Sequence, residues 1–138
     1  MELRDKVVVV TGGASGIGTG LCRRFREEGV RGLVIADLNG DAASELAAEL
    51  DGTSYALDVR DESAIAAMVA ETEAEFGQID LFCSNAGILN LDGDDYWATS
   101  SNNDVWQMNW EVHVMAHIYA ARACLPGMIE RGEGHFLH

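Results

Sequence analysis

A short apolar run followed by a cluster of glycines constrains the fold of this chain more than any other stretch. Residues 7–10 are all valines, and β-branched residues without polar alternation are typical of a strand buried on both faces of a parallel sheet. Glycines follow at positions 12, 13, 16 and 18, where the lack of a Cβ allows positive φ and close approach of a bulky anion. Ile17, Leu21 and Phe25 then repeat at fourfold spacing, which predicts an amphipathic helix over 17–28 with these residues on its apolar face.

Strand, turn and helix together predict a seat for phosphate. The first N–H groups of a helix lack internal partners, and the positive end of the helix dipole attracts negative charge. The alternative is a glycine-rich connection that binds nothing, since a glycine pattern alone is a weak signal. The spacing is Thr11-Gly12, three residues, Gly16, one residue, Gly18, which is neither the commoner G-x-G-x-x-G nor a Walker loop.

Composition bounds the function classes. The chain has 138 residues, enough for one domain, and no apolar run near the roughly 18 residues that a membrane span requires. Its amino end lacks the apolar core and cleavage site of a secretory signal, so we expect a cytoplasmic protein. The net charge of −14 argues against nucleic acid and anionic membranes as partners. The cysteines at 22, 83 and 124 are odd in number and lie in apolar contexts, which indicates reduced core thiols.

The motif at 11–18 resembles the fingerprint T-G-x-x-x-G-x-G of the short-chain dehydrogenase/reductase family. The resemblance implies an α/β protein of Rossmann type: a doubly wound parallel sheet in three αβα layers, here ending after the fifth strand. It also implies an oxidoreductase that interconverts an alcohol and a ketone or aldehyde with a nicotinamide dinucleotide. The residues that it implies at the pyrophosphate are Gly12, Ser15, Gly16, Ile17 and Gly18.

An acidic residue follows the second predicted strand, residues 31–36, at Asp37. In a dinucleotide-binding βαβ unit, an acid about 20 residues past the glycines accepts hydrogen bonds from the adenosine ribose, and its charge repels a 2′-phosphate. Neither Leu38 nor Ser15 is the Arg or Lys that NADP-preferring family members tend to place at these positions. We therefore expect NAD as the cofactor, with Asp37 and Leu38 among its binding residues. The alternative is that Asp37 only begins a turn with the Asn-Gly pair that follows.

A third predicted strand, residues 53–57, ends at Asp58 and Val59. In the family, an Asp-Val pair at this place lies against adenine, and its carboxylate accepts from the exocyclic amino group. The resemblance implies these roles for Asp58 and Val59. The alternative is that Asp58 caps the next helix, although Asp61 competes for that position.

Two helices flank this strand in the predicted pattern. The first runs to Leu50 and is capped by Asp41 or a neighbour, and the second covers 61–76 and is stopped by Gly77.

Asn85, Ala86 and Gly87 follow a fourth predicted strand over 79–84. They resemble the family's N-A-G motif, usually written N-N-A-G, with Ser84 in place of the first Asn. Small residues suit a backbone that must pass close to the ribose of a cofactor. The resemblance therefore implies that all three bind the cofactor.

Residues 88–103 are polar, acidic and irregular, which predicts a loop. The side chains that would either border a substrate or simply be solvated are Asp92, Asp94, Asp95, Tyr96 and Trp97.

A long helix over 104–130 is predicted next, and it is apolar nearly all round. One face would lie on the sheet, and the resemblance implies that another packs in a homo-oligomer. Asn109 aligns with the Asn of the family's Asn-Ser-Tyr-Lys tetrad, so the resemblance implies that it supports the proton relay. His113 and His117 are four apart, but no third metal ligand is evident, so we interpret them as surface or packed histidines and expect no metal. Residues 135–137 predict the start of a fifth strand.

The family's Tyr-x-x-x-Lys pair is missing from these residues, because Lys6 is the sole lysine. Either the rest of the protein lies outside this sequence, or the chain is a naturally short product. The first hypothesis is the cofactor-binding half of an NAD-dependent oxidoreductase that acts on a small alcohol or carbonyl substrate. The second is a non-catalytic dinucleotide-binding module. A methyltransferase is a third, although Thr11 stands where that class expects an acidic residue.

Overall fold

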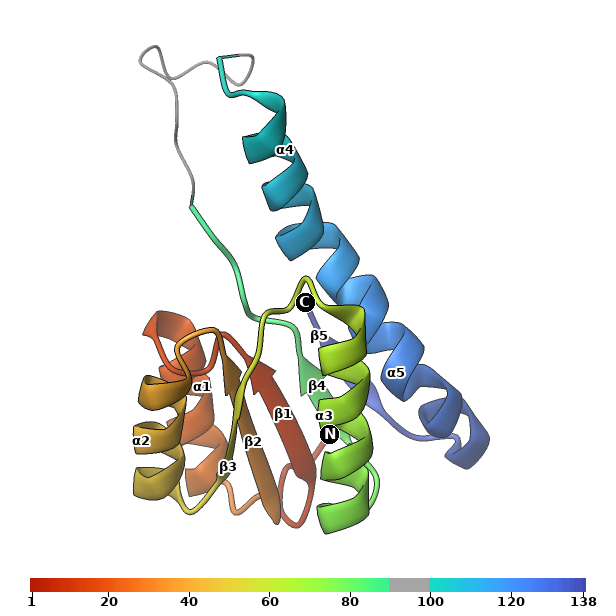
Figure 1. Ribbon diagram of the computed structural model, residues 1–138. Helices are drawn as coiled ribbons and strands as arrows, with labels where there is room; N and C mark the ends of the chain where they lie inside the picture. The colour runs from red at the N-terminus through yellow and green to blue at the C-terminus, as the bar shows by residue number, and fades with distance from the viewer. Residues whose placement is uncertain (90–99) are drawn as a thin grey trace.

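The computed structural model describes residues 1–89 and 100–138 and contains one five-stranded parallel sheet (Figure 1). The strands are β1 (Val7–Thr11), β2 (Gly32–Asp37), β3 (Thr53–Ala56), β4 (Leu81–Cys83) and β5 (His135–Leu137). They pair in the order β3-β2-β1-β4-β5. The direction of strand order reverses between β1 and β4, as in doubly wound dinucleotide-binding folds. The predicted fold class is confirmed, with strand ends one or two residues from those expected.

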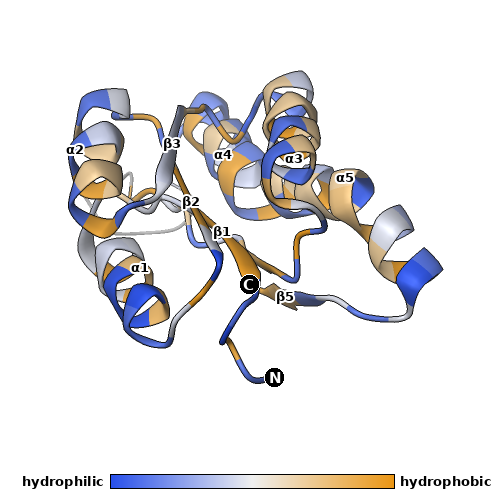
Figure 2. Ribbon diagram, turned by 90° about the horizontal axis from the view of Figure 1, so that it is seen from below, coloured by the Kyte–Doolittle hydropathy of each residue, from blue (hydrophilic) through white to orange (hydrophobic). Residues whose placement is uncertain are grey.

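Helices cover both faces of the sheet (Figure 2). On one face lie α1 (Gly16–Glu27) and α2 (Gly40–Leu50), and on the other lie α3 (Glu62–Phe76) and α5 (Ala116–Arg131). A right-handed crossover places successive helices on the same face until the chain returns to the middle of the sheet. The three-layer αβα arrangement is therefore confirmed.

The valines of β1 bind the two helical layers to the sheet. All four of the residues 7–10 are fully buried. Val7 and Val9 belong to the apolar cluster shared with α3 and α5, whereas Val8 and Val10 belong to the cluster shared with α1 and α2. Successive side chains of a strand point to opposite faces, so an unbroken apolar run is what a doubly covered central strand requires.

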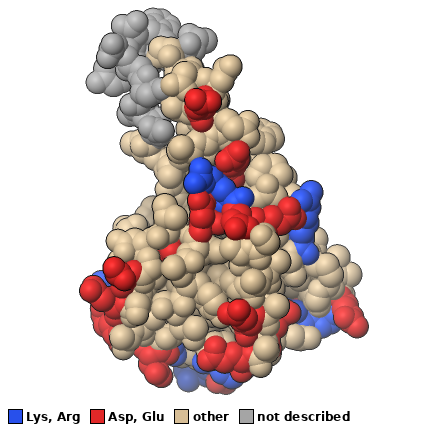
Figure 3. Space-filling model, in the orientation of Figure 1, with Lys and Arg blue, Asp and Glu red and all other residues tan. Residues whose placement is uncertain are grey.

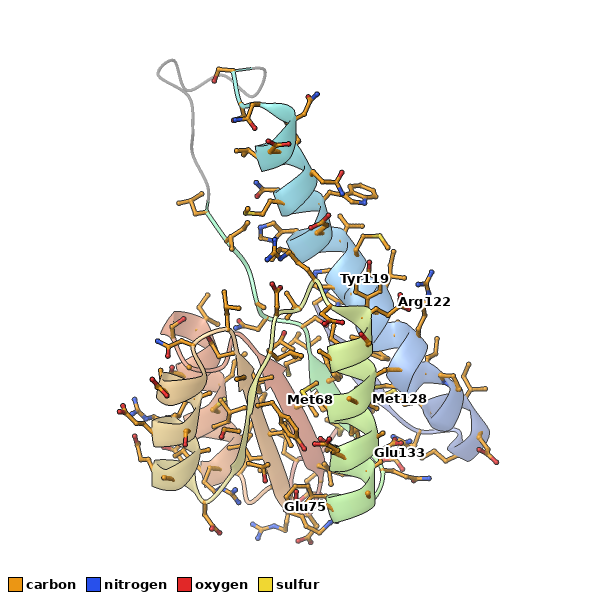
Figure 4. All side chains as sticks on the ribbon, viewed as in Figure 1. Met68, Glu75, Tyr119, Arg122, Met128 and Glu133 are labelled. Carbon is orange, nitrogen blue, oxygen red and sulfur yellow. The ribbon has the colours of Figure 1, made fainter. Side chains whose placement is uncertain are left out.

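Apolar packing joins α3 and α5 to the sheet, and a surface ion pair joins these two helices to each other. Phe82 on β4 is fully buried, and its ring centroid lies 6.1 Å from that of Phe136 on β5. Met68 on α3 and Met128 on α5 belong to the same cluster, and Figure 4 labels both. Arg122 on α5 donates to Glu62 on α3 at 2.9 Å.

Helix caps follow the predicted chemistry with one change of residue. Asn39 caps α2, accepting from the Ala42 amide at 3.1 Å, so the cap is a neighbour of Asp41. Asp61 caps α3 by accepting from the amides of Ser63 and Ala64, which leaves Asp58 without that role. Gly77 ends α3 as expected.

Leu21 and Phe25 pack in the apolar cluster on the predicted face of α1, but Ile17 does not. Ile17 is 77% exposed, and the residues of α1 that are buried are Gly18, Cys22 and Phe25. The reason is steric: a Cβ at Gly18 would lie 2.0 Å from the Gly12 carbonyl oxygen, so a glycine marks the line of closest approach. The prediction of Ile17 on the buried face was wrong.

The long helix is continuous over 103–131 but is not α-helical throughout. It comprises α4 (Asn103–Trp110), the π-helical turn η1 (Glu111–Met115) and α5. In η1 the Ala116 amide donates to the Glu111 carbonyl, five residues back. In Figure 1 the α4 end extends beyond the sheet, and α4 has no buried residue. The sequence predicted the extent of this helix but not the π turn.

Part of the predicted 88–103 loop lies outside the described residues. That part holds Asp92, Asp94, Asp95, Tyr96 and Trp97. In the described ranges, no helix is long and apolar enough to cross a bilayer.

Replacing Phe82 should test the packing of α3 and α5 against the sheet. Because the side chain is fully buried between the sheet and α3/α5, Phe82→Ala should lower the free energy of unfolding by about 3–5 kcal/mol. Glu45→Ala is the control, since Glu45 lies on the exposed side of α2 and its loss should change that free energy by less than about 0.5 kcal/mol. Urea denaturation followed by circular dichroism would measure both. Equal losses in the two variants would contradict this packing.

Candidate functional site

A cleft of about 420 Å³ lies at the carboxyl edge of the sheet. It is lined by Gly12, Ser15, Asp37, Leu38, Leu57, Asp58, Val59, Arg60, Ala86, Gly87, Ile88, Met108 and Val112. Open α/β sheets bind ligands at this edge, where the strand order reverses. The structure thus brings together predicted residues from the ends of four strands.

Four predicted cofactor-binding residues do not line the cleft. They are Gly16, Ile17, Gly18 and Asn85. Gly18 and Asn85 lie behind the wall that the glycine turn forms, whereas Gly16 and Ile17 begin α1 and are exposed.

Close backbone packing explains the glycines after β1. Gly12 has φ of +63°, and a Cβ there would lie 2.7 Å from the Ala86 Cα. Gly18 allows α1 to reach the Gly12 carbonyl, as described above. Gly16 has φ of +49° with no heavy atom near its Cβ position, so conformation rather than space favours glycine there.

The N-terminus of α1 is left without a side-chain cap. Ser15 stands at the N-cap with φ of −144° but makes no capping hydrogen bond, and the first turn holds no acid. Within the described part of the chain, the other helices that follow a loop begin at Asn39, Asp61 or Asn102, each of which accepts from the helix backbone. The amides at the start of α1 are therefore suited to an external anion.

Two turns are tied together behind this wall. The Asn85 side-chain amide donates to the carbonyls of Thr11 and Gly12, each at 3.1 Å. The Thr11 hydroxyl accepts from the Ala86 amide at 3.2 Å and donates to the Cys83 carbonyl at 3.4 Å. Asn85 thus orients the turn rather than lining the cleft. Thr11 was recognised only as part of the motif, and its position at the end of a buried strand was the signal for this role.

Asp37 faces the cleft from the end of β2. Its Oδ2 accepts from the Ala14 amide at 3.0 Å, and its Oδ1 accepts from the Asn39 amide at 2.9 Å. The carboxylate therefore begins the turn into α2, as the alternative interpretation held, and also borders the cleft. Backbone donors hold it in place while leaving acceptor capacity for a ligand.

Asp58 forms a bidentate ion pair at the end of β3. The Arg60 guanidinium donates from Nε to Oδ1 at 3.0 Å and from Nη2 to Oδ2 at 2.6 Å. These bonds lower the pKa of Asp58 below its ordinary value, against an opposing effect of partial burial. Arg60 carries no signal of this role in the sequence, because a two-residue spacing after a strand does not show that the side chains of Asp58 and Arg60 meet.

Apolar contacts close the other side of the cleft. Met108 and Val112, from α4 and η1, line it together with Ile88. The Nε2 of His113 lies 3.0 Å from the Ile88 carbonyl oxygen and 3.4 Å from its amide nitrogen, so this histidine ties η1 to the segment after β4. No local sequence pattern predicts these contacts, because they depend on how the long helix crosses the sheet edge.

Asn109 does not line the cleft. Its side-chain amide donates to the Val105 carbonyl at 2.8 Å, one turn back in α4. The residue stands just before η1, and π turns inside α-helices often occur at functional sites.

The histidines and cysteines in the described ranges form no group of three or more residues suited to a metal ion. The Nδ1 atoms of His117 and His138 lie 3.1 Å apart. Cys22, Cys83 and Cys124 are free and buried, and burial raises the pKa of each thiol to about 12. These thiols are inert core residues, as predicted.

The residues present fit a dinucleotide. An uncapped helix N-terminus beside a glycine turn suits a diphosphate, and a carboxylate at the end of the next strand suits ribose hydroxyls. A Cβ at Gly12 would collide with Ala86, so the glycine keeps these two cleft-lining turns in contact.

The family model that matches this chain is that of a dehydrogenase family, and two of its relatives are dehydrogenases. The model of the short chain dehydrogenase family matches residues 6–137. The 1-deoxy-11-beta-hydroxypentalenate dehydrogenase of Streptomyces exfoliatus is 36% identical over 144 residues, which cover 100% of this chain and 51% of that protein. The NADP-dependent 3-hydroxy acid dehydrogenase of Shigella flexneri is 33% identical and covers 96% of this chain and 52% of its own length.

A solved structure agrees with the fold. The 3-ketoacyl-(acyl-carrier-protein) reductase of Brucella melitensis, complexed with NADH, superposes with a TM-score of 0.85 at 28% identity. The match covers 94% of this chain and 53% of that structure. The chain spans about half the length of the curated relatives that it matches. With its family model, relatives and structural neighbour in agreement, the chain belongs to the short-chain dehydrogenase/reductase family.

Proposed function

We propose that this protein is an NAD-dependent oxidoreductase in which residues 1–138 form the NAD-binding Rossmann domain. Its reaction would interconvert an alcohol and a ketone or aldehyde on a small molecule, with the nicotinamide supplying or accepting hydride. The observation that carries the proposal is the placement of Asp37 on the cleft beside the uncapped start of α1. Ribose and diphosphate are neighbours in a dinucleotide, and the groups suited to each are neighbours here.

The choice of NAD over NADP rests on charge. A carboxylate near the 2′ position would repel a phosphate by about 1–4 kcal/mol at ~4 Å, depending on the effective dielectric. The residue that follows Asp37 is Leu38, which brings no positive charge to the same position. One relative is named as NADP-dependent and one structural neighbour contains NADH, so the family alone does not decide this point.

The other site residues divide along the cleft. Gly12, Ser15, Gly16, Ile17 and Gly18 would form or support the pyrophosphate seat, Asp58 and Val59 would take the adenine, and Asn85, Ala86 and Gly87 would shape the middle of the cleft. Gly12, Ser15, Asp58, Val59, Ala86 and Gly87 support this by lining the cleft directly. Asn85 and Gly18 would act by holding the turn.

Asn109 would support the proton relay through the long helix. Its amide is bound to Val105, which fixes the side chain next to the π turn. These 138 residues hold no Tyr-x-x-x-Lys pair, so on this proposal the group that moves the substrate proton is not among them.

We also propose a homo-oligomer formed through the long helix. Large apolar side chains are exposed along it: Trp106, Trp110, Ile118, Leu125 and Ile129. Contiguous exposed apolar surface marks interaction sites in soluble proteins.

We also propose that the protein works in the cytoplasm. The three buried free thiols support a reducing compartment of this kind.

Removing the charge of Asp37 should relax cofactor selection. We expect the protein to bind NADH at least about tenfold more tightly than NADPH, and Asp37→Asn to reduce that ratio severalfold because the repulsion of the 2′-phosphate is lost. Asp41→Asn removes the same charge from the exposed first turn of α2 and should leave the ratio unchanged. Titration of nicotinamide fluorescence would measure the dissociation constants. Tighter binding of NADPH by the unaltered protein would contradict the proposal.

A methyl group at Gly18 should damage the phosphate seat. Because its Cβ would lie 2.0 Å from the Gly12 carbonyl oxygen, Gly18→Ala should lower the free energy of unfolding by about 1–3 kcal/mol and weaken NADH binding. Gly20→Ala, in the same helix with no heavy atom within 4 Å of its Cβ position, should instead stabilise by about 0.5–1 kcal/mol. Thermal unfolding and the same fluorescence titration would compare them. Similar behaviour of both variants would count against the turn geometry.

Charges on the long helix should break the oligomer. Sedimentation velocity should show the unaltered protein larger than a monomer, and the double variant Ile118→Asp, Leu125→Asp should be monomeric because two carboxylates would be desolvated at the interface. Ala48→Asp, on the exposed side of α2, is the control and should keep the oligomer. An unaltered protein that sediments as a monomer would refute this part of the proposal.

A further inference from the structure

Arg60 commits most of the acceptor capacity of Asp58. Its backbone amide donates to Oδ1 at 3.0 Å, Nε lies 3.0 Å from Oδ1 and 3.1 Å from Oδ2, and Nη2 donates to Oδ2 at 2.6 Å. A carboxylate offers about four lone-pair sites, so these N–H groups leave room for roughly one further donor. The side chain of Asp58 is therefore fixed in orientation and retains a single vacancy for a hydrogen bond.

The pair borders the cleft. Asp58 and Arg60 line it together with Val59 and Asp37, and both also line an adjoining hollow at the start of α3. Arg60 is the sole Lys or Arg among the residues that line this cleft in the described ranges. Glu111, at the start of η1, adds a second negative charge near the guanidinium. Figure 3 shows basic and acidic side chains interspersed on the face seen there, amid a mostly tan surface.

We propose that Arg60 is a positioning residue that makes the cleft selective for a base carrying an exocyclic amine, by holding Asp58 with one acceptor site open. This inference rests on the proposed function, in which Asp58 takes the adenine. Arg60 acts through the carboxylate and needs no contact with the cofactor.

The fork of the guanidinium is what the role requires. Arg presents Nε and Nη2 in a fixed plane that matches both oxygens of a carboxylate, whereas Lys offers a point charge on a flexible stem. Without the two guanidinium hydrogen bonds, the Asp58 side chain after β3 would rotate and be solvated. Binding of a base through its amine would then include the entropic cost of ordering this side chain. Lysine would restore the charge but not the orientation.

The test compares the dissociation constant of NADH with that of reduced nicotinamide hypoxanthine dinucleotide, which has a carbonyl oxygen in place of the exocyclic amine. The unaltered chain should bind NADH at least about tenfold more tightly, because a carbonyl oxygen cannot donate to Asp58. Arg60→Met and Arg60→Lys should both weaken NADH binding by about tenfold and leave the hypoxanthine analogue nearly unchanged. Asp58→Asn should show the same loss, with no further loss in the Asp58→Asn, Arg60→Met double variant.

Arg23→Met is the matched control. Arg23 makes a comparable bidentate pair with Glu49, at 3.1 and 2.9 Å, between α1 and α2. Its loss should alter neither affinity, and circular dichroism should show the same secondary structure in all variants.

The outcomes separate this inference from the proposed function. If the unaltered chain binds neither dinucleotide, the proposed function fails. If it binds NADH but Arg60→Met retains that affinity, or if both dinucleotides weaken equally, the positioning role is refuted. Full recovery by Arg60→Lys would assign the effect to charge alone and would also overturn it.

Discussion

The contact on which the site depends is the hydrogen bonding between the turns that follow β1 and β4. β1 lies between β2 and β4, so the chain turns away in different directions after β1 and after β4 at the carboxyl edge of the sheet. Asn85 ties the two turns behind the cleft by donating to two consecutive carbonyls of the glycine turn, and the Thr11 hydroxyl accepts from the Ala86 amide. This arrangement fixes where α1 begins and therefore where its unpaired amides point.

The same edge gathers negative charge that the protein itself compensates. Asp37 is held by two backbone amides, whereas Asp58 is held by a guanidinium fork. Backbone donors leave the charge of Asp37 in place, which suits discrimination against a phosphate. The ion pair leaves Asp58 oriented but nearly saturated, which suits a single directed hydrogen bond. Two carboxylates at neighbouring strand ends thus have different capacities.

Much of this arrangement follows from sequence, and the part that does not has a physical reason. The valines of β1, the glycine motif and the capping Asp61 act locally, so their periodicity and residue type predict the strand, the turn and the helix start. The prediction for Ile17 failed because helical periodicity does not show which residues of α1 lie closest to the sheet when a glycine, here Gly18, stands at the point of closest contact. The π turn η1 and the contact of His113 with Ile88 depend on the path of the long helix over the sheet edge, which no local pattern encodes.

The acidity of the chain has a consequence for how a dinucleotide would arrive. With a formal net charge of −14, this chain presents a repulsive field to any anionic diphosphate at long range, while attraction at contact distance comes from the amides at the start of α1 and from Arg60, whose charge is paired with Asp58. Salt shortens that field, with a Debye length of about 8 Å at physiological ionic strength. Encounter should therefore quicken as ionic strength rises, the reverse of the behaviour of enzymes that steer anionic ligands with basic surfaces.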